Sequence, residues 1–431
     1  MRLDTSSDLS HASALPIRRG RRQLLAASAG NLAEWYDWLA YAYLSAYFAD
    51  QIFPPGGDPV VVTLSAFAVF AVGFAARPVG GLLLGLLADR HGRRAAMATT
   101  ISLMGAGQLA MALLPTYQRI GVASPVLLVV IRLVQGLSVG GESTVSAVFL
   151  VESAPAGRRG LYSSIGYVSG NLGQLLASGV AALLAAQLTT AQMHSWGWRL
   201  AFALGAVACL VGLWIRHGTQ ETYQPGPEPA DRPGAFDFLR SNPREAALIV
   251  GMTLGATVTF YTWTTFLPTY ARLTVGFAPG TALLVSTLSL AFFTVLQPLA
   301  GMLSDRVGRK PLLIAFGAGF TVLTVPLLGL LRDSFWNLLL ISCAGMVLLT
   351  GYTAVSGAVM AELFPARVRT AGIGLSYAAT VAAFGGTAPY LATTLIDRSH
   401  ADWFAWYVSG LTLISTLVYT GMRETKGATL T

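Results

Sequence analysis

Five ionisable side chains stand inside long apolar runs of this sequence, and their chemistry suits the binding of an anion and the movement of protons. They are Glu34, Asp37, Arg77, Arg132 and Glu142. A charge in such surroundings is costly unless it is paired or hydrated, so it marks a candidate functional site. Arginine binds carboxylates bidentately and stays charged, whereas a carboxylate can take up a proton when its arginine is engaged elsewhere. We therefore expect Arg77 and Arg132 to receive a carboxylate and the three acids to carry protons.

Helical geometry gives three of these residues defined positions. Glu34 and Asp37 are three residues apart and share one helix face with Tyr41. Counting about 1.5 Å per residue from the charged ends of the runs places Arg77 at the depth of Asp37. This depth favours a pair between Asp37 and Arg77.

A second set lies on another apolar run. Arg132, Gln135 and Glu142 fall within about 80° of one another on a helical wheel, so they also share a face. The alternative for all five charges is that they form permanent ion pairs that only hold helices together.

The composition identifies the elements that must position these charges as membrane helices. Of 431 residues, 54% are hydrophobic and 11% are charged, whereas a soluble domain carries roughly 25% charged residues. Cys209 and Cys343 both lie in apolar runs, and the five histidines lie in loops or near the termini. We therefore expect no disulfide framework, no metal site, no cofactor and no catalytic residues. The basic residues that give the net charge of +8 lie mainly in the loops between the apolar runs, so we expect no nucleic-acid partner.

Twelve stretches are long and apolar enough to cross about 30 Å of hydrocarbon, which takes about 20 residues in a helix. They cover approximately residues 24–49, 59–87, 95–115, 124–150, 161–187, 198–216, 246–270, 280–303, 311–331, 337–361, 370–396 and 403–422. The sequence therefore predicts an all-α membrane protein with twelve transmembrane helices.

The positions of Lys and Arg predict the orientation of these helices. Of the 28 basic residues, 21 fall in segments that share one side of the membrane with the N-terminus. Because basic loops stay in the cytoplasm, both termini are expected there.

The chain divides into two similar halves. Residues 217–245 are rich in Pro, Gly and charge and are predicted to be a cytoplasmic linker between six-helix halves at 24–216 and 246–422, with cytoplasmic tails at 1–23 and 423–431. GLLADRHGRR at 85–94 recurs as GMLSDRVGRK at 301–310. Parallel repeats of six helices indicate a transporter with its site at mid-membrane between the halves.

These motifs resemble those of the major facilitator superfamily. Its signature G-x-L-x-D-R-x-G-R-[RK] occurs twice, and R-x-x-Q-G occurs as Arg132, Gln135 and Gly136. The metabolite/proton symporter branch is resembled through NLAEWYDW at 31–38, RPVGG at 77–81, QGLSVGGE at 135–142, WGWR at 196–199 and ELFPARVR at 362–369. GLSYA at 374–378 and FGG at 384–386 add a likeness to permeases for α-ketoglutarate.

The resemblance implies a proton-coupled symporter in a bacterial inner (plasma) membrane that imports a small organic acid anion, such as the dicarboxylate α-ketoglutarate, by alternating access. It also implies that the acid of the first span, Asp37, works with Arg132, so both pairings of Asp37 stay open. A dianion needs at least two protons to cancel its charge against an inside-negative potential. The expected partners are this anion, protons and the lipid bilayer, and the chain is expected to be a monomer.

Further polar residues on the predicted spans are candidates for the substrate pocket, with ordinary bonding between helices as the alternative. The full set of substrate-binding candidates is Arg77, Arg132, Tyr41, Gln135, Asn171, Gln174, Tyr261, Tyr377 and Arg199. Arg199 is equally suited to be an anchor beside interfacial tryptophans.

The two repeated charged motifs are predicted to act as gates. Their residues can bridge helix ends at the cytoplasmic surface, which would favour an outward-open state and break on switching. The candidates are Asp89, Arg90, His91, Arg93, Asp305, Arg306 and Arg309. The alternative is that these charges serve only to orient the helices.

Three rival functions stay open. The same fold can carry a tricarboxylate such as citrate, or a zwitterion such as proline or betaine. A membrane sensor without transport would need an output domain, and the linker and tails fall below the roughly 50 residues of a small domain.

Overall fold

The computed structural model describes residues 17–56, 58–91, 93–139, 151, 154–155, 157–217, 243–363 and 375–428. Glu142 and most of the predicted linker lie outside these residues. The side chains of 85–97 are also outside the description, and they include Asp89, Arg90, His91 and Arg93. The regular structure of the described residues is entirely helical.

The N-terminal half places a helix at each of its six predicted spans. Its elements are α1 (Ile17–Ile52), α2 (Pro59–His91), α3 (Arg93–Leu113), α4 (Tyr117–Ile120), α5 (Ala123–Val139), α7 (Arg159–Gln187), α8 (Thr190–Gln192), the π-helical turn η1 (Met193–Gly197) and α9 (Trp198–His217). The fourth predicted span, 124–150, is described only as far as Val139.

The C-terminal half also places helices at its six predicted spans. Its elements are α11 (Pro243–Tyr261), the π-helical turn η2 (Thr262–Phe266), α12 (Leu267–Val275), α13 (Pro279–Val307), α14 (Lys310–Gly329), α15 (Phe335–Thr353), α16 (Ser356–Leu363), the π-helical turn η3 (Val381–Gly385), α18 (Ala388–Asp397) and α19 (Ala401–Gly421). Residues 375–380 form the helical turns that lead into η3.

Length and composition suit these helices to a membrane. Eight helices of the described chain are long and apolar enough to span it, and the shorter segments Ala98–Leu113 and Ala123–Val139 are also apolar. Spans seven and eleven are each interrupted by a π-helical turn, η2 and η3. Such turns widen a helix locally and are frequent at functional sites.

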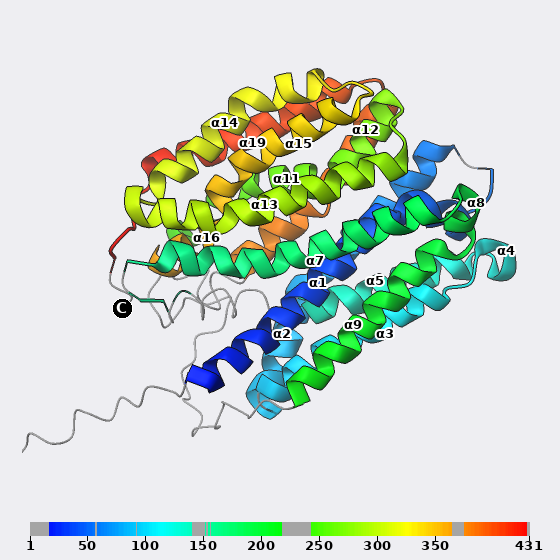
Figure 1. Cartoon of the computed structure of the whole chain (residues 1–431), viewed down its shortest axis with the longest axis horizontal. Helices are drawn as coiled ribbons and strands as arrows, with labels where there is room; N and C mark the ends of the chain where they lie inside the picture. The colour runs from blue at the N-terminus through cyan, green and yellow to red at the C-terminus, as the bar shows by residue number, and fades with distance from the viewer. Residues whose placement is uncertain are drawn as a thin grey trace, which may run out of the picture.

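The two halves pack along long helices that run through the whole bundle. In Figure 1, α7 of the N-terminal half and α13 of the C-terminal half run side by side between the halves, and they form the most extensive helix contact described. Glycines allow this approach, because a Cβ at Gly301 would stand 2.7 Å from the carbonyl oxygen of Gly160. On the other side of the interface, α2 contacts η3 and α18.

We call the end of the bundle that holds Asp305, Arg309 and residues 422–428 the C-terminal end. The other end holds the short helices α4 and α8 and is called the opposite end (Figure 1). The described site residues of spans one, two and four, namely Glu34, Asp37, Tyr41, Arg77, Arg132 and Gln135, lie between these two ends.

Candidate functional site

Asp37 and Arg132 form a completely buried ion pair in the N-terminal half. The Arg132 Nη1 atom lies 3.2 Å from Asp37 Oδ2, and both side chains are 0% exposed. The structure therefore joins Asp37 to Arg132, as the resemblance implied, and not to Arg77, as the depth along the helices suggested. Removing one partner of such a pair leaves an uncompensated buried charge.

Two amides complete the surroundings of Asp37. Gln108 Nε2 in α3 donates to Asp37 Oδ1 at 2.7 Å, and Gln135 Nε2 in α5 donates to the same atom at 2.5 Å. The Arg132 guanidinium also stacks 4.0 Å above the ring of Tyr41, whose hydroxyl donates to the backbone carbonyl of Ala66. Tyr41 thus supports the arginine with its ring while its hydroxyl is occupied by backbone.

Arg77 has a different environment from Arg132. Its guanidinium lies 4.2 Å from the centre of the Trp38 ring and 3.9 Å from that of Phe74. It is within hydrogen-bonding reach of the Tyr261 hydroxyl across the interface between the halves. Among the described residues, no carboxylate stands within ion-pair distance of Arg77, although it is buried to 9% exposure. Arg77 is therefore a buried cation held by aromatic rings.

Glycines bring the helices of the two arginines together. A Cβ at Gly136 in α5 would stand 2.1 Å from the carbonyl oxygen of Gly73 in α2, and one at Gly80 would stand 1.9 Å from that of Leu137. Only glycine permits such close backbone contact. Gly136 belongs to the R-x-x-Q-G motif, so this motif supplies both Arg132 and the contact surface that sets its distance from α2.

A small cavity lies between the halves beside Arg77. It encloses about 30 Å³, which is room for water but not for an organic acid of several carbon atoms. Its walls carry six aromatic side chains from both halves, namely Trp35, Tyr167, Phe260, Tyr261, Tyr352 and Tyr377. Tyr261 both lines the cavity and contacts Arg77, so it links the guanidinium to the cavity wall.

Hydroxyl groups from both halves line the cavity. Ser356 Oγ donates to the Tyr167 hydroxyl at 3.3 Å, and Tyr377 is within hydrogen-bonding reach of Tyr167. The Tyr352 hydroxyl is buried and within hydrogen-bonding reach of Thr253. The cavity is therefore lined by hydroxyl groups that can bind a polar group of a ligand.

Three further predicted residues lie in the N-terminal half. Asn171 and Gln174 of α7 are buried, and both amide atoms of Asn171 and Oε1 of Gln174 lack partners among the described residues. Glu34 is 3% exposed and interacts electrostatically with the Tyr261 hydroxyl. Glu34 is therefore a buried acid close enough to Tyr261 for an electrostatic interaction.

Arg199 lies away from this group, near the opposite end. It donates to the backbone carbonyls of Ser195 at 2.8 Å and Leu114 at 3.1 Å, and it stacks 4.0 Å from the centre of the Trp198 ring. These contacts tie the start of α9 to the end of α3. The structure does not bring Arg199 together with Arg77 and Arg132, and its geometry is that of an anchor.

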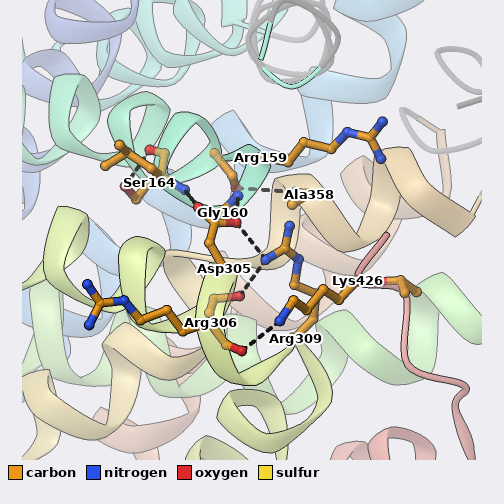
Figure 2. A network of polar contacts seen from close by, with 12 residues as sticks. Arg159, Gly160, Ser164, Asp305, Arg306, Arg309, Ala358 and Lys426 are labelled. Carbon is orange, nitrogen blue, oxygen red and sulfur yellow. Dashed lines mark hydrogen bonds and ion pairs between the residues drawn. The ribbon is translucent and has the colours of Figure 1, made fainter. Parts of the chain in front are cut away.

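The C-terminal end is closed by a polar network between the halves. Asp305 accepts hydrogen bonds from the backbone amides of Gly160 at 2.8 Å and Leu161 at 3.0 Å, at the first turn of α7 (Figure 2). A carboxylate at a helix N-terminus is stabilised by the unpaired amides and the helix dipole. Arg309 Nη1 holds the same carboxylate at 2.8 Å. Of the predicted gating residues, Asp305 therefore bridges the halves, and Arg309 supports its carboxylate.

Arg306 does not take part through its side chain. In Figure 2 its guanidinium points away from the network, and its backbone carbonyl accepts a hydrogen bond from Lys426 Nζ at 2.6 Å. Glu362 also belongs to this network, because it forms ion pairs with Arg309 and with Arg159 of the N-terminal half. Arg159 and Glu362 were not among the predicted gating residues. Their signal in the sequence is a weaker repeat, in which Glu152 to Arg159 matches Glu362 to Arg369.

The bundle is also closed toward the opposite end. The Tyr43 hydroxyl in α1 donates to the carbonyl oxygen of Thr264 in η2. Arg272 in α12 lies 3.4 Å from the Thr63 hydroxyl in α2, and the ring centres of Phe67 and Phe266 are 5.5 Å apart. The described parts of the two halves therefore contact each other at both ends of the bundle, with the cavity between these contacts.

No metal-binding group was found in the part of the chain that the structure describes: it holds no cluster of three His, Cys, Asp or Glu side chains arranged to bind an ion.

Comparisons with known proteins agree with this architecture. The family model described as Major Facilitator Superfamily matches residues 38–294 and 254–430. The α-ketoglutarate permease of Escherichia coli (strain K12) is 40% identical over 417 residues, which cover 96% of each chain. The glycine betaine/proline/ectoine/pipecolic acid transporter OusA of Dickeya dadantii (strain 3937) is 31% identical over 95% of this chain and 86% of its own.

The fold is shared with solved transporters. The solved structure of the proton:xylose symporter XylE bound to 6-bromo-6-deoxy-D-glucose superposes on this chain with a TM-score of 0.75. The two chains are 19% identical, and the match covers 96% of this chain and 98% of the XylE chain. The predicted fold of twelve membrane helices in two halves is thereby confirmed, and these relatives are transporters and not enzymes.

Proposed function

Because this chain belongs to the major facilitator superfamily, we propose that it imports a small organic acid anion together with protons, and that the anion is a dicarboxylate such as α-ketoglutarate. The observation that carries this proposal is Arg77, a buried guanidinium beside the central cavity with no carboxylate of the described residues at ion-pair distance. The 40% identity to an α-ketoglutarate permease supports the choice of acid.

Arg77 is proposed to bind one carboxylate of the substrate. Its charge is stabilised by the rings of Trp38 and Phe74, which leave the guanidinium edge available for a bidentate contact. Tyr261 contacts Arg77 and lines the cavity. The anion therefore has to displace the Tyr261 hydroxyl when it binds, in a more open state.

The second polar end of the substrate is proposed to meet the hydroxyls of the C-terminal half. Tyr352 and Tyr377 of the C-terminal half line the cavity and can donate to a carboxylate or keto oxygen. A substrate that contacts Arg77 in one half and these hydroxyls in the other draws the halves together. This is the way in which binding can favour closure.

Asp37 is proposed to be a proton carrier. While Arg132 and the two glutamines contact Asp37, a negative charge on its carboxylate is compensated. If opening of the site draws Arg132 toward the incoming anion, Asp37 is left buried and neutralises by binding a proton. Proton uptake and anion binding are then coupled through competition for one guanidinium.

Proton number follows from charge. Each negative charge that enters against the membrane potential is opposed by about 2.3 kcal/mol per 100 mV, so a dicarboxylate needs at least two protons to enter without net negative charge. Glu34, buried near Tyr261, is the second proposed carrier. Glu142 stays a prediction for the same role.

A zwitterion is the second candidate substrate, and the aromatic lining of the cavity favours it. Methylated ammonium groups bind to cages of aromatic rings, and six such rings surround this cavity. A betaine would place its carboxylate at Arg77 and its cation among the rings.

We propose that the protein lies in the plasma membrane of a bacterium. The C-terminal end of the bundle and both chain termini would then face the cytoplasm. The basic residues support it, since Arg159, Arg306, Arg309, Lys310 and Lys426 all gather at this end.

Uptake by the purified protein tests the proposed function. Proteoliposomes are given an inward proton gradient and radiolabelled α-ketoglutarate, with succinate, citrate, proline and betaine as competitors. We expect uptake that depends on the gradient and is displaced by dicarboxylates. Displacement only by proline or betaine would establish the zwitterion instead, and uptake that ignores the proton gradient would refute symport.

A further inference from the structure

The C-terminal segment Arg423–Ala428 continues past the end of α19 and lies across the C-terminal end of the bundle. Glu424 accepts hydrogen bonds from the backbone amides of Arg309 at 2.9 Å and Lys310 at 3.0 Å, where α14 begins. Lys426 Nζ donates to the carbonyl of Arg306 at the end of α13. The segment is therefore attached to the junction of α13 and α14.

The charge of Glu424 strengthens this attachment. Partial burial opposes ionisation of the carboxyl group, but the backbone amides that donate to it outweigh burial and hold its pKa below the ordinary value. A depressed pKa in the folded state means that the contact stabilises the fold above the ordinary carboxyl pKa of about 4.3 and is lost as the pH falls below the folded value. At neutral pH the attachment is fully present.

The same segment reaches the salt bridges that close the gate. Thr425 is 6% exposed, and its hydroxyl donates to Glu362 Oε2 at 2.7 Å. The other oxygen of Glu362 lies 3.3 Å from Arg309 Nη2 and 3.6 Å from Arg159 Nη1. Glu362 is thus held from three sides, by Thr425 of the segment, Arg309 of the C-terminal half and Arg159 of the N-terminal half.

The segment also contacts the N-terminal half directly. Arg159 Nη1 donates to the carbonyl oxygen of Ala428 at 2.6 Å. Arg159 is the first residue of α7, beside the amides that Asp305 caps. Opening the C-terminal end separates α7 from α13, so it has to break the contacts of Arg159 with Ala428 and Glu362 as well as those of Asp305.

We propose that Glu362 and the segment Arg423–Ala428 are working parts of the gate at the C-terminal end, in which the segment straps the two halves together and positions Glu362 for Arg159. The repeated charged motif supplies Asp305 and Arg309, and the strap adds a contact that depends on the chain beyond the last helix. Loss of the strap then favours the state that is open at the C-terminal end.

Thr425→Val removes the hydroxyl donor with little change of shape. A hydrogen bond to a carboxylate is worth enough that its loss shifts the ratio of closed to open C-terminal ends about tenfold. Thr425→Ser keeps the donor and is expected to restore the native ratio. Thr420→Val is the matched control, because the Thr420 hydroxyl is exposed and bonds only to Leu417 of its own helix.

The ratio of closed to open C-terminal ends is measured by double electron–electron resonance between spin labels on the two halves. Labels go on cysteines at Ile165 in α7 and Val307 in α13, which are both exposed, after Cys209 and Cys343 have been replaced. We expect the long-distance population to grow in Thr425→Val and to stay native in Thr425→Ser and Thr420→Val. The readout does not depend on the substrate, so its failure is separate from failure of the proposed function.

Two results would overturn the strap. One is a native distance distribution in Thr425→Val, and the other is an equal shift in Thr425→Ser. If Thr425→Val does not yield folded protein, the full chain shortened to end at Lys426 replaces it, because this removes the Arg159 contact with Ala428 and keeps Glu424 and Thr425. The shortened chain must show the same growth of the long-distance population, or the proposal fails.

Discussion

At the scale of residues, two buried arginines of the same chemistry are distinguished by their partners. Arg132 is neutralised by Asp37 at 3.2 Å, whereas Arg77 is surrounded by Trp38, Phe74 and Tyr261. A guanidinium whose charge is already compensated by a carboxylate has less to gain from an incoming anion than one that is held only by rings. We therefore assign anion binding to Arg77 and proton coupling to the pair.

Substitution of Arg77 tests the assignment of anion binding. Arg77→Lys keeps the positive charge but loses the planar, bidentate edge, so we expect KM for the organic acid to rise at least about tenfold. Arg77→Gln removes the charge as well and is expected to abolish uptake. Arg119→Gln, at an exposed arginine of α4, is the control. A native KM in Arg77→Lys contradicts a bidentate contact.

Substitution of Asp37 tests proton coupling. Asp37→Asn cannot bind the proton, so we expect accumulation driven by a proton gradient to disappear while exchange of internal for external substrate continues. The variant leaves Arg132 uncompensated and is expected to lose about 3–5 kcal/mol of stability, which thermal unfolding measures. Asp50→Asn is the control, since Asp50 is 57% exposed and pairs with His194 near the opposite end. Gradient-driven accumulation by Asp37→Asn would remove Asp37 from the proton path.

At the scale of elements, the position of each charged residue depends on how closely its helix packs against the next. Gly73, Gly80 and Gly136 bring α2 against α5. Gly385 and Gly386 of span eleven make room for Tyr261 and Phe74, because a Cβ at these positions would stand 2.6 and 2.7 Å from them. The glycines of the motifs thus set the surroundings of Arg77.

A methyl group added at the α2 and α5 contact tests this role. In Gly136→Ala the Cβ meets the carbonyl oxygen of Gly73, so we expect about 1–3 kcal/mol of destabilisation and a raised KM as α2 moves. Gly410→Ala in α19 is the matched control, because nothing lies within 4 Å of its added Cβ. Thermal unfolding and uptake are measured for both. Equal stability of the two variants would contradict the role of this close contact in packing α2 against α5.

Long apolar runs predicted the positions of the helices, because hydrophobicity over about 20 residues identifies a membrane span. The pairing of Asp37 was not resolved by depth, since counting residues along an axis ignores helix tilt and the direction in which a long arginine side chain extends. The π-helical turns η2 and η3 could not be predicted, because neither an apolar run nor a charged motif marks where a helix widens. Thr425 and Ala428 belong to no motif, so their contacts with Glu362 and Arg159 appear only in the folded chain.

At the scale of the whole molecule, the described parts of the two halves touch at both ends, with a cavity of about 30 Å³ between these contacts. Alternating access requires that the contacts at one end break while those at the other hold. Asp305, Arg309 and Glu362 close the C-terminal end, and Tyr43, Arg272 and Phe67 hold the opposite end. The buried charges of Asp37, Arg77 and Arg132 lie between these two sets of contacts, where we propose that a proton and an anion are exchanged with one side at a time.

Movement of protons with the substrate tests the central claim most directly. Radiolabelled α-ketoglutarate is added to weakly buffered proteoliposomes held at zero membrane potential, and the external pH and internal label are recorded together. Because the proposed carriers are Asp37 and a second buried acid, we expect the external medium to become alkaline by at least two protons for each dianion that enters. Entry of the label with one proton or none would contradict the account.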